Sequence, residues 1–435
     1  TTGGANVFLG KDAGGNVTSG STNIALGQLA LGAGAVTGNY NIAFGKESGK
    51  AITSGLNNIL LGKCAGAAID QGQNHIMIGL DAGKASTGAS YTNVYLGIYA
   101  GQNTTTGSFN FYGQNSAGGC QKTGCYNVAI GTNALKGSST INNNTASDNV
   151  ALGQGAGWCI SSGKNNVALG QQAMGAGVVT GSYNVAFGYY AGRRSTTGAS
   201  NVFIGRQAGQ ETTIGQYNTY INWAGQNRQC GHNNIAVGLY ALQGNGTPAN
   251  NCGQGNIALG AHAGCVVDTG CYNFFGGFNA GKSVTTGCRN IALGLCALQD
   301  AATVNDTIAI GRLSGKTAGG GSANIFLGAY AGSQNGTAAD NDAANNIAIG
   351  YATGCALTDG DNNIFMGNSA GGHTTVGTAN VIIGNYAGQC HVAGDENVYI
   401  SHCAGRCMCN GSANVAIGQH ALQGGSTVSD NTGTL

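Results

Sequence analysis

Proline occurs once among 435 residues, and charged residues make up only 8% of the chain. A proline content this low excludes a collagen-like protein, although glycine occurs 81 times. The formal net charge is +1 and no basic stripe is present, which excludes a nucleic-acid-binding protein, because phosphates need positive side chains around them. No run reaches the roughly 18–20 apolar residues that cross a bilayer, so we expect no membrane insertion.

A nine-residue phrase returns 24 times: Asn, Val or Ile, two apolar residues, Gly, two variable positions, Ala, then Gly or Leu. It reads NVFLGKDAG from Asn6, NIAFGKESG from Asn41 and NVFIGRQAG from Asn201, almost always at steps of 17 residues. A short fixed period is typical of a solenoid, in which no repeat buries its apolar face alone. Because such a stack grows without splitting, we expect residues 1–435 to form a single continuous repeat array.

Seventeen residues are too few for a helix pair or a βαβ unit, which needs about 30. Glycine also recurs where it would break a helix. The sequence therefore predicts an all-β protein, a parallel β-solenoid (β-roll) of about 24 rungs, each rung being one turn of the coil stacked about 4.8 Å from the next. Glycines at the fifth phrase position and three residues before the Asn should mark corners that need φ > 0 or close backbone approach.

The Asn that opens each phrase should stack its amide into a hydrogen-bonded ladder along the coil. His75 and Thr307 are the two substitutes in this column. Three steps are 22 residues long, from 127 to 149, 234 to 256 and 324 to 346, and their extra polar residues should bulge from one edge. The structural residues that we single out are Asn6, Asn23, Asn41, Asn58, Asn93, Asn127, Asn166 and Asn201.

The third phrase position is apolar in every rung, although side chains alternate between the two faces of a strand. If the second and fourth positions point into the coil, the third forms an outward stripe that cannot remain in water. Strands apolar on both faces are buried on both faces, so we expect other copies of the chain to cover it. The residues expected in this oligomer seam are Phe8, Leu60, Met77, Tyr95, Phe203, Tyr220, Phe326, Phe365 and Tyr399.

The phrase N-V-A-I-G followed by a small residue resembles the YadA-like head repeats of trimeric autotransporter adhesins, which form a β-roll. The longer form, TTG followed by N-V-x-I-G-x-x-A-G, is similar to repeats of phage and virus tail-fibre proteins. The resemblance implies a homotrimer with an attachment surface. The 17-residue period is longer than that of the adhesin head, and no stalk or membrane anchor is present in the sequence.

Fifteen cysteines favour an oxidising, extracellular setting. Cys271 and Cys288 share one rung position, as do Cys390 and Cys407, and neighbouring rungs bring such pairs within the Cα distance of a disulfide. Cys120 and Cys125 could bridge a single turn instead. Because the total is odd, at least one thiol must stay free or pair with another chain.

Two clusters raise the question of a metal. One contains Cys390, His391, His402, Cys403, Cys407 and Cys409. Its spacing matches no zinc pattern, so disulfides or inert thiols are the favoured interpretation. Asp342 and Asp359 occupy one position in consecutive rungs and could hold Ca²⁺, but solvated turn acids explain them as well. We therefore expect neither a metal nor a cofactor.

Both ends of the array are in frame. Thr2-Gly3 precedes Asn6, and Thr432-Gly433 stands as it would before a further Asn beyond Leu435. A finished solenoid needs atypical capping repeats, and none is recognisable here. We expect the chain to be a segment of a longer fibre, or to join end to end with its copies.

These features favour a structural and adhesive extracellular fibre, a tail fibre of a virion or a cell-surface appendage that contacts a cell-surface or glycan receptor. A filament subunit that polymerises end to end is the alternative. A polysaccharide-degrading spike would need paired carboxylates, but the 16 acidic residues are scattered, so we expect no enzyme. An ice-binding solenoid would need Thr-x-Thr columns, whereas Thr105 and Thr106 are adjacent and point to opposite faces.

Overall fold

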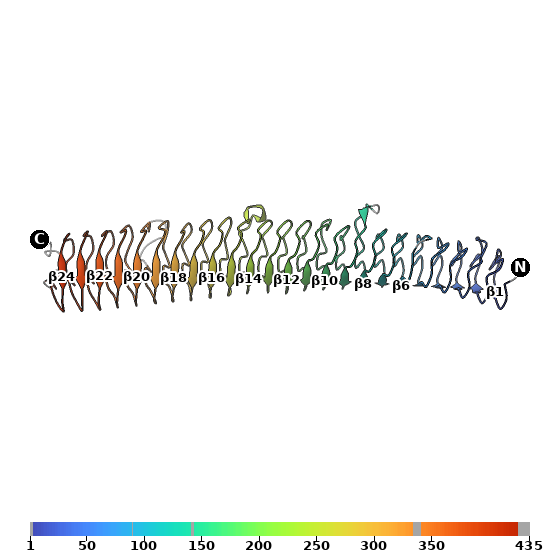
Figure 1. Cartoon of the computed structure of the whole chain (residues 1–435), viewed down its shortest axis with the longest axis horizontal. Helices are drawn as coiled ribbons and strands as arrows, with labels where there is room; N and C mark the ends of the chain where they lie inside the picture. The colour runs from blue at the N-terminus through green and yellow to red at the C-terminus, as the bar shows by residue number, and fades with distance from the viewer. Residues whose placement is uncertain (1–2, 89, 141–142, 334–340, 425–435) are drawn as a thin grey trace. The chain divides into compact units, whose positions relative to one another are not determined.

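The computed structural model describes residues 3–88, 90–140, 143–333 and 341–424. Thr2, Thr432 and Gly433, on which the prediction of a continuing array depends, lie outside the described residues. The chain divides into two compact units, Thr1–Tyr217 and Asn218–Leu435, and each is described by itself. The predicted all-β parallel solenoid of about 24 turns, with its 17-residue period, is confirmed (Figure 1).

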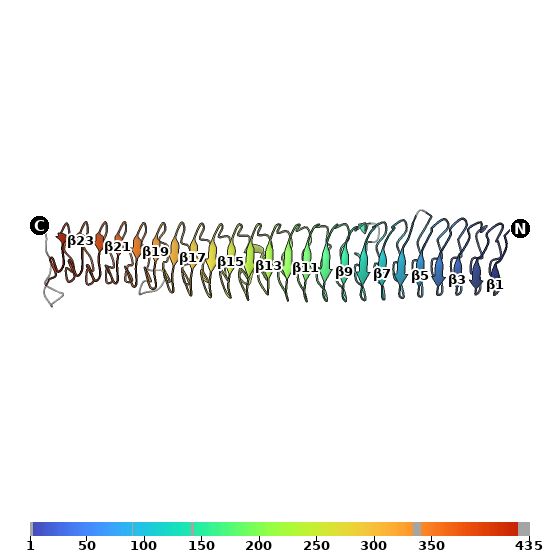
Figure 2. The ribbon, with the colours of Figure 1, turned by 60° about the horizontal axis from the view of Figure 1, so that its bottom comes forward.

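Each rung contributes one strand of three residues, and Figure 2 shows the strands of each unit as a row of arrows along one side of the coil. The first unit contains β1 (Val7–Leu9), β2 (Ile24–Leu26), β3 (Ile42–Phe44), β4 (Ile59–Leu61), β5 (Ile76–Ile78), β6 (Val94–Leu96), β7 (Phe111–Gly113), β8 (Val128–Ile130), β9 (Val150–Leu152), β10 (Val167–Leu169), β11 (Val185–Phe187) and β12 (Val202–Ile204). The second unit contains β13 (Thr219–Ile221), β14 (Ile235–Val237), the 3₁₀ turn η2 (Pro248–Asn250), β15 (Ile257–Leu259), β16 (Phe274–Gly276), β17 (Ile291–Leu293), β18 (Ile308–Ile310), β19 (Ile325–Leu327), β20 (Ile347–Ile349), β21 (Ile364–Met366), β22 (Val381–Ile383), β23 (Val398–Ile400) and β24 (Val415–Ile417).

Neighbouring strands within a unit pair in parallel and in register, position for position. Val7 pairs with Ile24, for example, and Val398 with Val415. The glycine at the fifth position then turns the corner, with φ between 107° and 143°. A Cβ on Gly27 would lie 2.8 Å from the carbonyl carbon of Gly45 in the next rung, so this column favours glycine for space as well as for φ. Gln114, Asn222 and Ser401 are its three exceptions, and they too have positive φ. The predicted role of these glycines is confirmed.

The side chains predicted to form the oligomer seam lie inside the coil, so that assignment is wrong. Phe8 in β1 is 37% exposed, while the others are fully buried in the core of their own chain. These buried residues are Leu60, Met77, Tyr95, Phe203, Tyr220, Phe326, Phe365 and Tyr399. The reason is the Asn at the first position: its amide is buried, and residues two apart in a strand share a face, so the third position is buried with it.

In the interior, a rung that has a large side chain at the third phrase position has a small one at the ninth, and the reverse. We call this relation the volume exchange. A large residue at the third position occurs with glycine at the ninth, as in Tyr95 with Gly101, and leucine at the ninth occurs with alanine at the third, as in Ala292 with Leu298. A Cβ on Gly101 would lie 2.6 Å from Cε2 of the Tyr95 ring. No rung carries large side chains at both positions, where the two would overlap.

This exchange can be tested at Ala292 and Leu298, both fully buried. Ala292→Phe alone should overfill the rung and lower the free energy of unfolding by about 1–3 kcal/mol. Adding Leu298→Gly should recover most of the loss, because it vacates the ninth position and suits the φ of 49° there. Thermal melts of the single and double variants provide the measurement, and additive losses would contradict the exchange.

Candidate self-association surface

The second and fourth phrase positions, rather than the third, form the outer face of the strands. The second position is Val or Ile in every strand except for Phe111, Thr219 and Phe274, and the fourth is apolar except for Gly113 and Gly276. No charged residue stands in either column of the strands that the structure describes. The most exposed members are Val7, Leu9, Phe44, Phe187, Val415 and Ile417. We call these two columns the outer strand face.

Exposed aromatic residues immediately precede the key Asn in several rungs. Tyr40, Tyr183, Tyr217 and Tyr272 are each about 60% exposed. Each lies in the left-handed region, with φ between 57° and 62°. A bulky aromatic side chain is unusual there, and a side chain this exposed gains little from the core. Tyrosine at such a place is typical of a contact surface.

The outer strand face is large for an uncovered apolar surface. In the first unit its 12 strands, each about 10 Å wide and about 4.8 Å apart, present roughly 600 Å². This is the upper end of the largest apolar patch on a typical monomer, about 300–600 Å². It also approaches the roughly 800 Å² that each partner contributes to a standard protein–protein interface. A patch of this size makes the outer strand face a candidate contact surface.

The predicted ladder of asparagine side chains is confirmed. The Asn41 Nδ2 donates to Asn23 Oδ1 at 3.1 Å and to the Gly55 carbonyl of the next rung at 2.8 Å. The backbone N–H of Asn41 also donates to Asn23 Oδ1, at 2.9 Å. The same contacts recur in both units, as at Asn166 and Asn273. Each buried amide is thereby satisfied by the adjoining rungs, which a buried polar group requires.

His75 replaces Asn in this ladder and reproduces its bonding. Its Nδ1 accepts the N–H of Asn93 at 3.1 Å, and its Nε2 lies 3.1 Å from the Ser90 carbonyl, to which it donates. This pairing requires the neutral ring with hydrogen on Nε2. Burial lowers the pKa of the imidazole to about 4, although the hydrogen bond to Ser90 opposes the shift. Protonation at Nδ1 would place a donor against the Asn93 N–H.

The His75 substitution predicts a pH-dependent stability. The folded-state pKa of about 4 lies below the usual value of 6.5, so the unfolded chain binds this proton more readily. The free energy of unfolding should have its full value above pH 6.5. It should decrease as the pH drops towards 4, by roughly 3 kcal/mol in total. His75→Asn should remove this contribution. Urea unfolding of both proteins at pH 7.5 and pH 4.5 tests it, and an equal acid loss in both would contradict it.

The three 22-residue steps share buried asparagines that the sequence analysis missed. Asn144, Asn251 and Asn341 each stand five residues before the next key Asn, and all are fully buried. Their Nδ2 atoms donate to the carbonyls of Cys120, Asn227 and Thr317 at 2.8–3.0 Å. The shared spacing N-x-[AG]-x-x-N was the signal that could have identified them. These asparagines anchor the base of each insertion to the coil.

Arg228 is the largest fully buried side chain in the second unit. Its guanidinium donates to the Val267 carbonyl at 2.9 Å and to the Gly253 carbonyl. Burial lowers the pKa of this group, and Tyr220 opposes the shift. Gln121 occupies the corresponding place in the first unit, donating to the Leu135 and Ile160 carbonyls at 3.1 and 2.9 Å. Both side chains tie the rungs around an insertion together, which is a structural role.

The cysteine predictions have different outcomes. The Sγ atoms of Cys271 and Cys288 lie 2.6 Å apart in adjacent rungs, and burial and the neighbouring thiol raise the pKa of Cys271 to about 11. Cys390 also has its predicted neighbour beside it, since Cys407 adds to burial in raising its pKa. Both pairs are thiols in this structure, so their disulfides stay predictions.

Cys120 and Cys125 are likewise free thiols, so the predicted bridge between them is not formed in this structure. Cys125 Sγ instead accepts the N–H of Ser108 at 3.3 Å, in a column where Ser, Asn and Asp side chains accept the same bond from neighbouring rungs. A disulfide that was not predicted joins Cys230 and Cys252, whose Cα atoms are 4.7 Å apart. Both stand four residues before a key Asn, which gives them the same place in adjacent rungs.

The neighbouring thiols can be tested by mild oxidation with a disulfide reagent. Cys271 and Cys288 should become linked, because their sulfurs already lie in contact, whereas Cys120 and Cys125 should remain open to alkylation. Trypsin cleaves after Lys282, which separates the two linked cysteines into different peptides. Mass spectrometry of the digest should show residues 229–282 joined to residues 283–289. Alkylation found on Cys271 and Cys288 themselves after oxidation would contradict the prediction.

The residues considered for a metal have other partners. Among the described residues, no three His, Cys, Asp or Glu side chains gather as a metal site requires. His391 is buried, with its ring nitrogens 2.8 Å from the Met408 carbonyl and 3.1 Å from the Gly394 carbonyl. Asp342 accepts the Gly320 N–H at 3.0 Å and Asp361 the Ala344 N–H at 2.7 Å, so both acids bind backbone groups.

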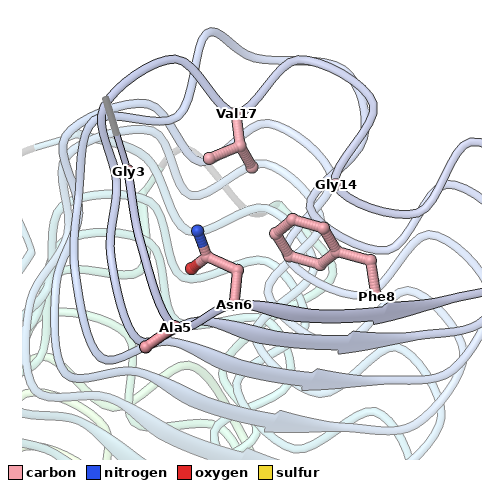
Figure 3. A pocket seen from close by; sticks show the side chains of 6 residues that line it. All are labelled: Gly3, Ala5, Asn6, Phe8, Gly14 and Val17. Carbon is pink, nitrogen blue, oxygen red and sulfur yellow. The ribbon is translucent and has the colours of Figure 1, made fainter. Parts of the chain in front are cut away.

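Figure 3 shows a hollow at β1 where Phe8 and Val17 lie across from Asn6. Gly3, Ala5 and Gly14 complete its lining, so it carries no group for acid–base or nucleophilic chemistry. In the described part of the chain, no helix has the length and apolar character to span a membrane. No protein-family model matches this chain, and no curated protein matches its sequence.

Proposed function

We propose that this protein is a structural and adhesive element of an extracellular fibre, and that copies of it associate through the outer strand face. The observation that carries the proposal is the pair of uncharged apolar columns on the outside of a coil whose interior is already filled. A filled core leaves the outer face as the only apolar surface of the strands that still needs a partner. Strands that are apolar on both sides are otherwise found in proteins that cover both sides.

A second copy is the partner that this face suits best. The two columns are neutral, and every rung repeats at the same spacing of about 4.8 Å, so the surface of one copy has the same period as the surface of another. A partner with a charged surface would lose solvation without gaining ion pairs there. The resemblance to adhesin heads and tail fibres supports a homotrimer, with the remaining sides of the coil facing a cell-surface or glycan receptor.

The contents of the rung support a structural role. Many of the polar groups buried in the coil hold rungs together, as in the Asn ladder and the bonds of Arg228. The acidic side chains of Asp342 and Asp361 are likewise engaged with backbone N–H groups. These residues stabilise a repeating scaffold, which displays a surface over many rungs.

The test places charge on the outer strand face. Val185→Lys with Phe187→Lys in β11 should convert the native trimer to monomers, because Lys cannot be covered without a partner for its charge. Gln171→Lys, at an exposed corner residue of the neighbouring rung, is the matched control and should leave the assembly unchanged. Sedimentation velocity gives the mass, and circular dichroism checks that the coil persists. A wild-type monomer at about 100 μM would overturn self-association.

A further inference from the structure

Two rungs depart from the pattern of the outer strand face in the same way. The first unit reads Phe-Asn-Phe-Tyr-Gly over 109–113, and the second reads Tyr-Asn-Phe-Phe-Gly over 272–276. In both, Phe stands at the second position and Gly at the fourth, where the other strands carry a smaller residue and then an apolar side chain. We call these segments the aromatic rungs.

The fold does not require this departure. The core place of each rung is already filled by its third residue, Tyr112 or Phe275, both fully buried. Gly113 and Gly276 stand within strands, where glycine loses more backbone entropy than other residues. Phe109 and Tyr272 precede the Asn with φ of 59° and 57° and are 46% and 60% exposed. Locally unfavourable residues that coincide on an exposed surface are typical of functional sites.

In the first unit the substitutions reshape the outer face into a flat aromatic surface. A Cβ on Gly113 would lie 3.5 Å from Cε1 of Phe111 and 3.7 Å from Cγ1 of Ile130, so the phenyl ring of Phe111 lies over the glycine. Beside it, the rings of Phe109 and Tyr126 stack with centroids 5.0 Å apart and planes 4° apart. Such rigid aromatic groups supply most of the affinity at many interfaces. In the second unit Cδ2 of Leu293 lies 2.7 Å from where a Cβ on Gly276 would stand, and Cε2 of Phe274 lies 4.0 Å from it.

A repeating face has a specific difficulty when it binds a copy of itself. Because the columns of Val, Ile and Leu repeat about every 4.8 Å, sliding one copy by one rung replaces nearly every contact with an equivalent one. Such a surface gives association without a defined register, as flat uniform strands do. Only positions that break the repeat distinguish one alignment from the next, as a single polar residue does in a coiled coil.

We propose that the aromatic rungs fix the register in which copies of this chain pack together. The inference rests on the proposed self-association through the outer strand face, and its occupant is a second copy. The neutral apolar character of that face and its roughly 600 Å² in the first unit suit such a partner. Each unit contains one aromatic rung. A copy shifted along the coil by one rung would therefore place the rings of Phe111 and Phe274 against the Val and Leu side chains of ordinary rungs.

The test converts both aromatic rungs to the ordinary pattern in the full chain, as Phe111→Val with Gly113→Ile and Phe274→Ile with Gly276→Leu. The coil should remain stable, since the new residues are those of the other rungs. Only the flexible end of the Leu293 side chain, 2.7 Å from where a Cβ on Gly276 would lie, has to shift. The control Val167→Ile with Leu169→Ile makes a comparable change in β10. A photo-cross-linking residue at Tyr183, which is 64% exposed and lies outside the aromatic rungs, reports which rung of the neighbouring copy it faces.

Wild type and control should cross-link to a single rung, and the converted protein to several. Its dissociation constant should also rise by about tenfold or more, as expected when aromatic anchors are removed. If the wild type is oligomeric and the converted protein keeps the same affinity and the same cross-link, the register role is wrong, while self-association is unaffected. A monomeric wild type would overturn self-association, and the register role with it.

Discussion

The ladder of buried asparagine side chains is the interaction on which the rest of this structure depends. Each amide nitrogen donates to the preceding Asn and to a carbonyl of the following rung, and each amide oxygen accepts from the following Asn. The amide is therefore satisfied only when a rung lies on each side at the spacing of a β-sheet. A single rung would leave the amide unpaired and its apolar residues exposed. A rung is therefore stable only when neighbouring rungs are stacked on it. This explains why strands of only three residues are stable in this fold.

The ladder also determines which way each strand faces. With the first position turned inward, the third must follow it, and the second and fourth must point out. The architecture, the period, the corner glycines and the ladder could all be predicted, because each follows from the repeat itself. The face of Tyr95 and Phe203 was predicted wrongly, although the buried Asn two residues earlier already contained the information. The error came from treating the amide and the strand alternation separately.

Other features depended on contacts between rungs that no single phrase displays. The bridge between Cys230 and Cys252 and the buried Asn144, Asn251 and Asn341 follow once positions are counted from the next key Asn. Counting forward from the preceding Asn hides them, since the insertions change the distance. Cys120 and Cys125 are close in sequence, but adjacent rungs, rather than adjacent residues, bring side chains together in this fold.

The most informative positions in a repeat protein are those where the repeat is broken without loss of the fold. His75 reproduces the hydrogen bonds of asparagine with a ring that titrates, and Arg228 and Gln121 close the gaps beside insertions. These side chains donate to backbone carbonyls inside the coil, where a buried group without a partner is destabilising. The aromatic rungs differ because they face outward, where a glycine in a strand or an aromatic residue at positive φ adds nothing to the packing of the core. A surface otherwise identical from rung to rung acquires distinguishable positions only through such departures, and this connects the local irregularity to assembly.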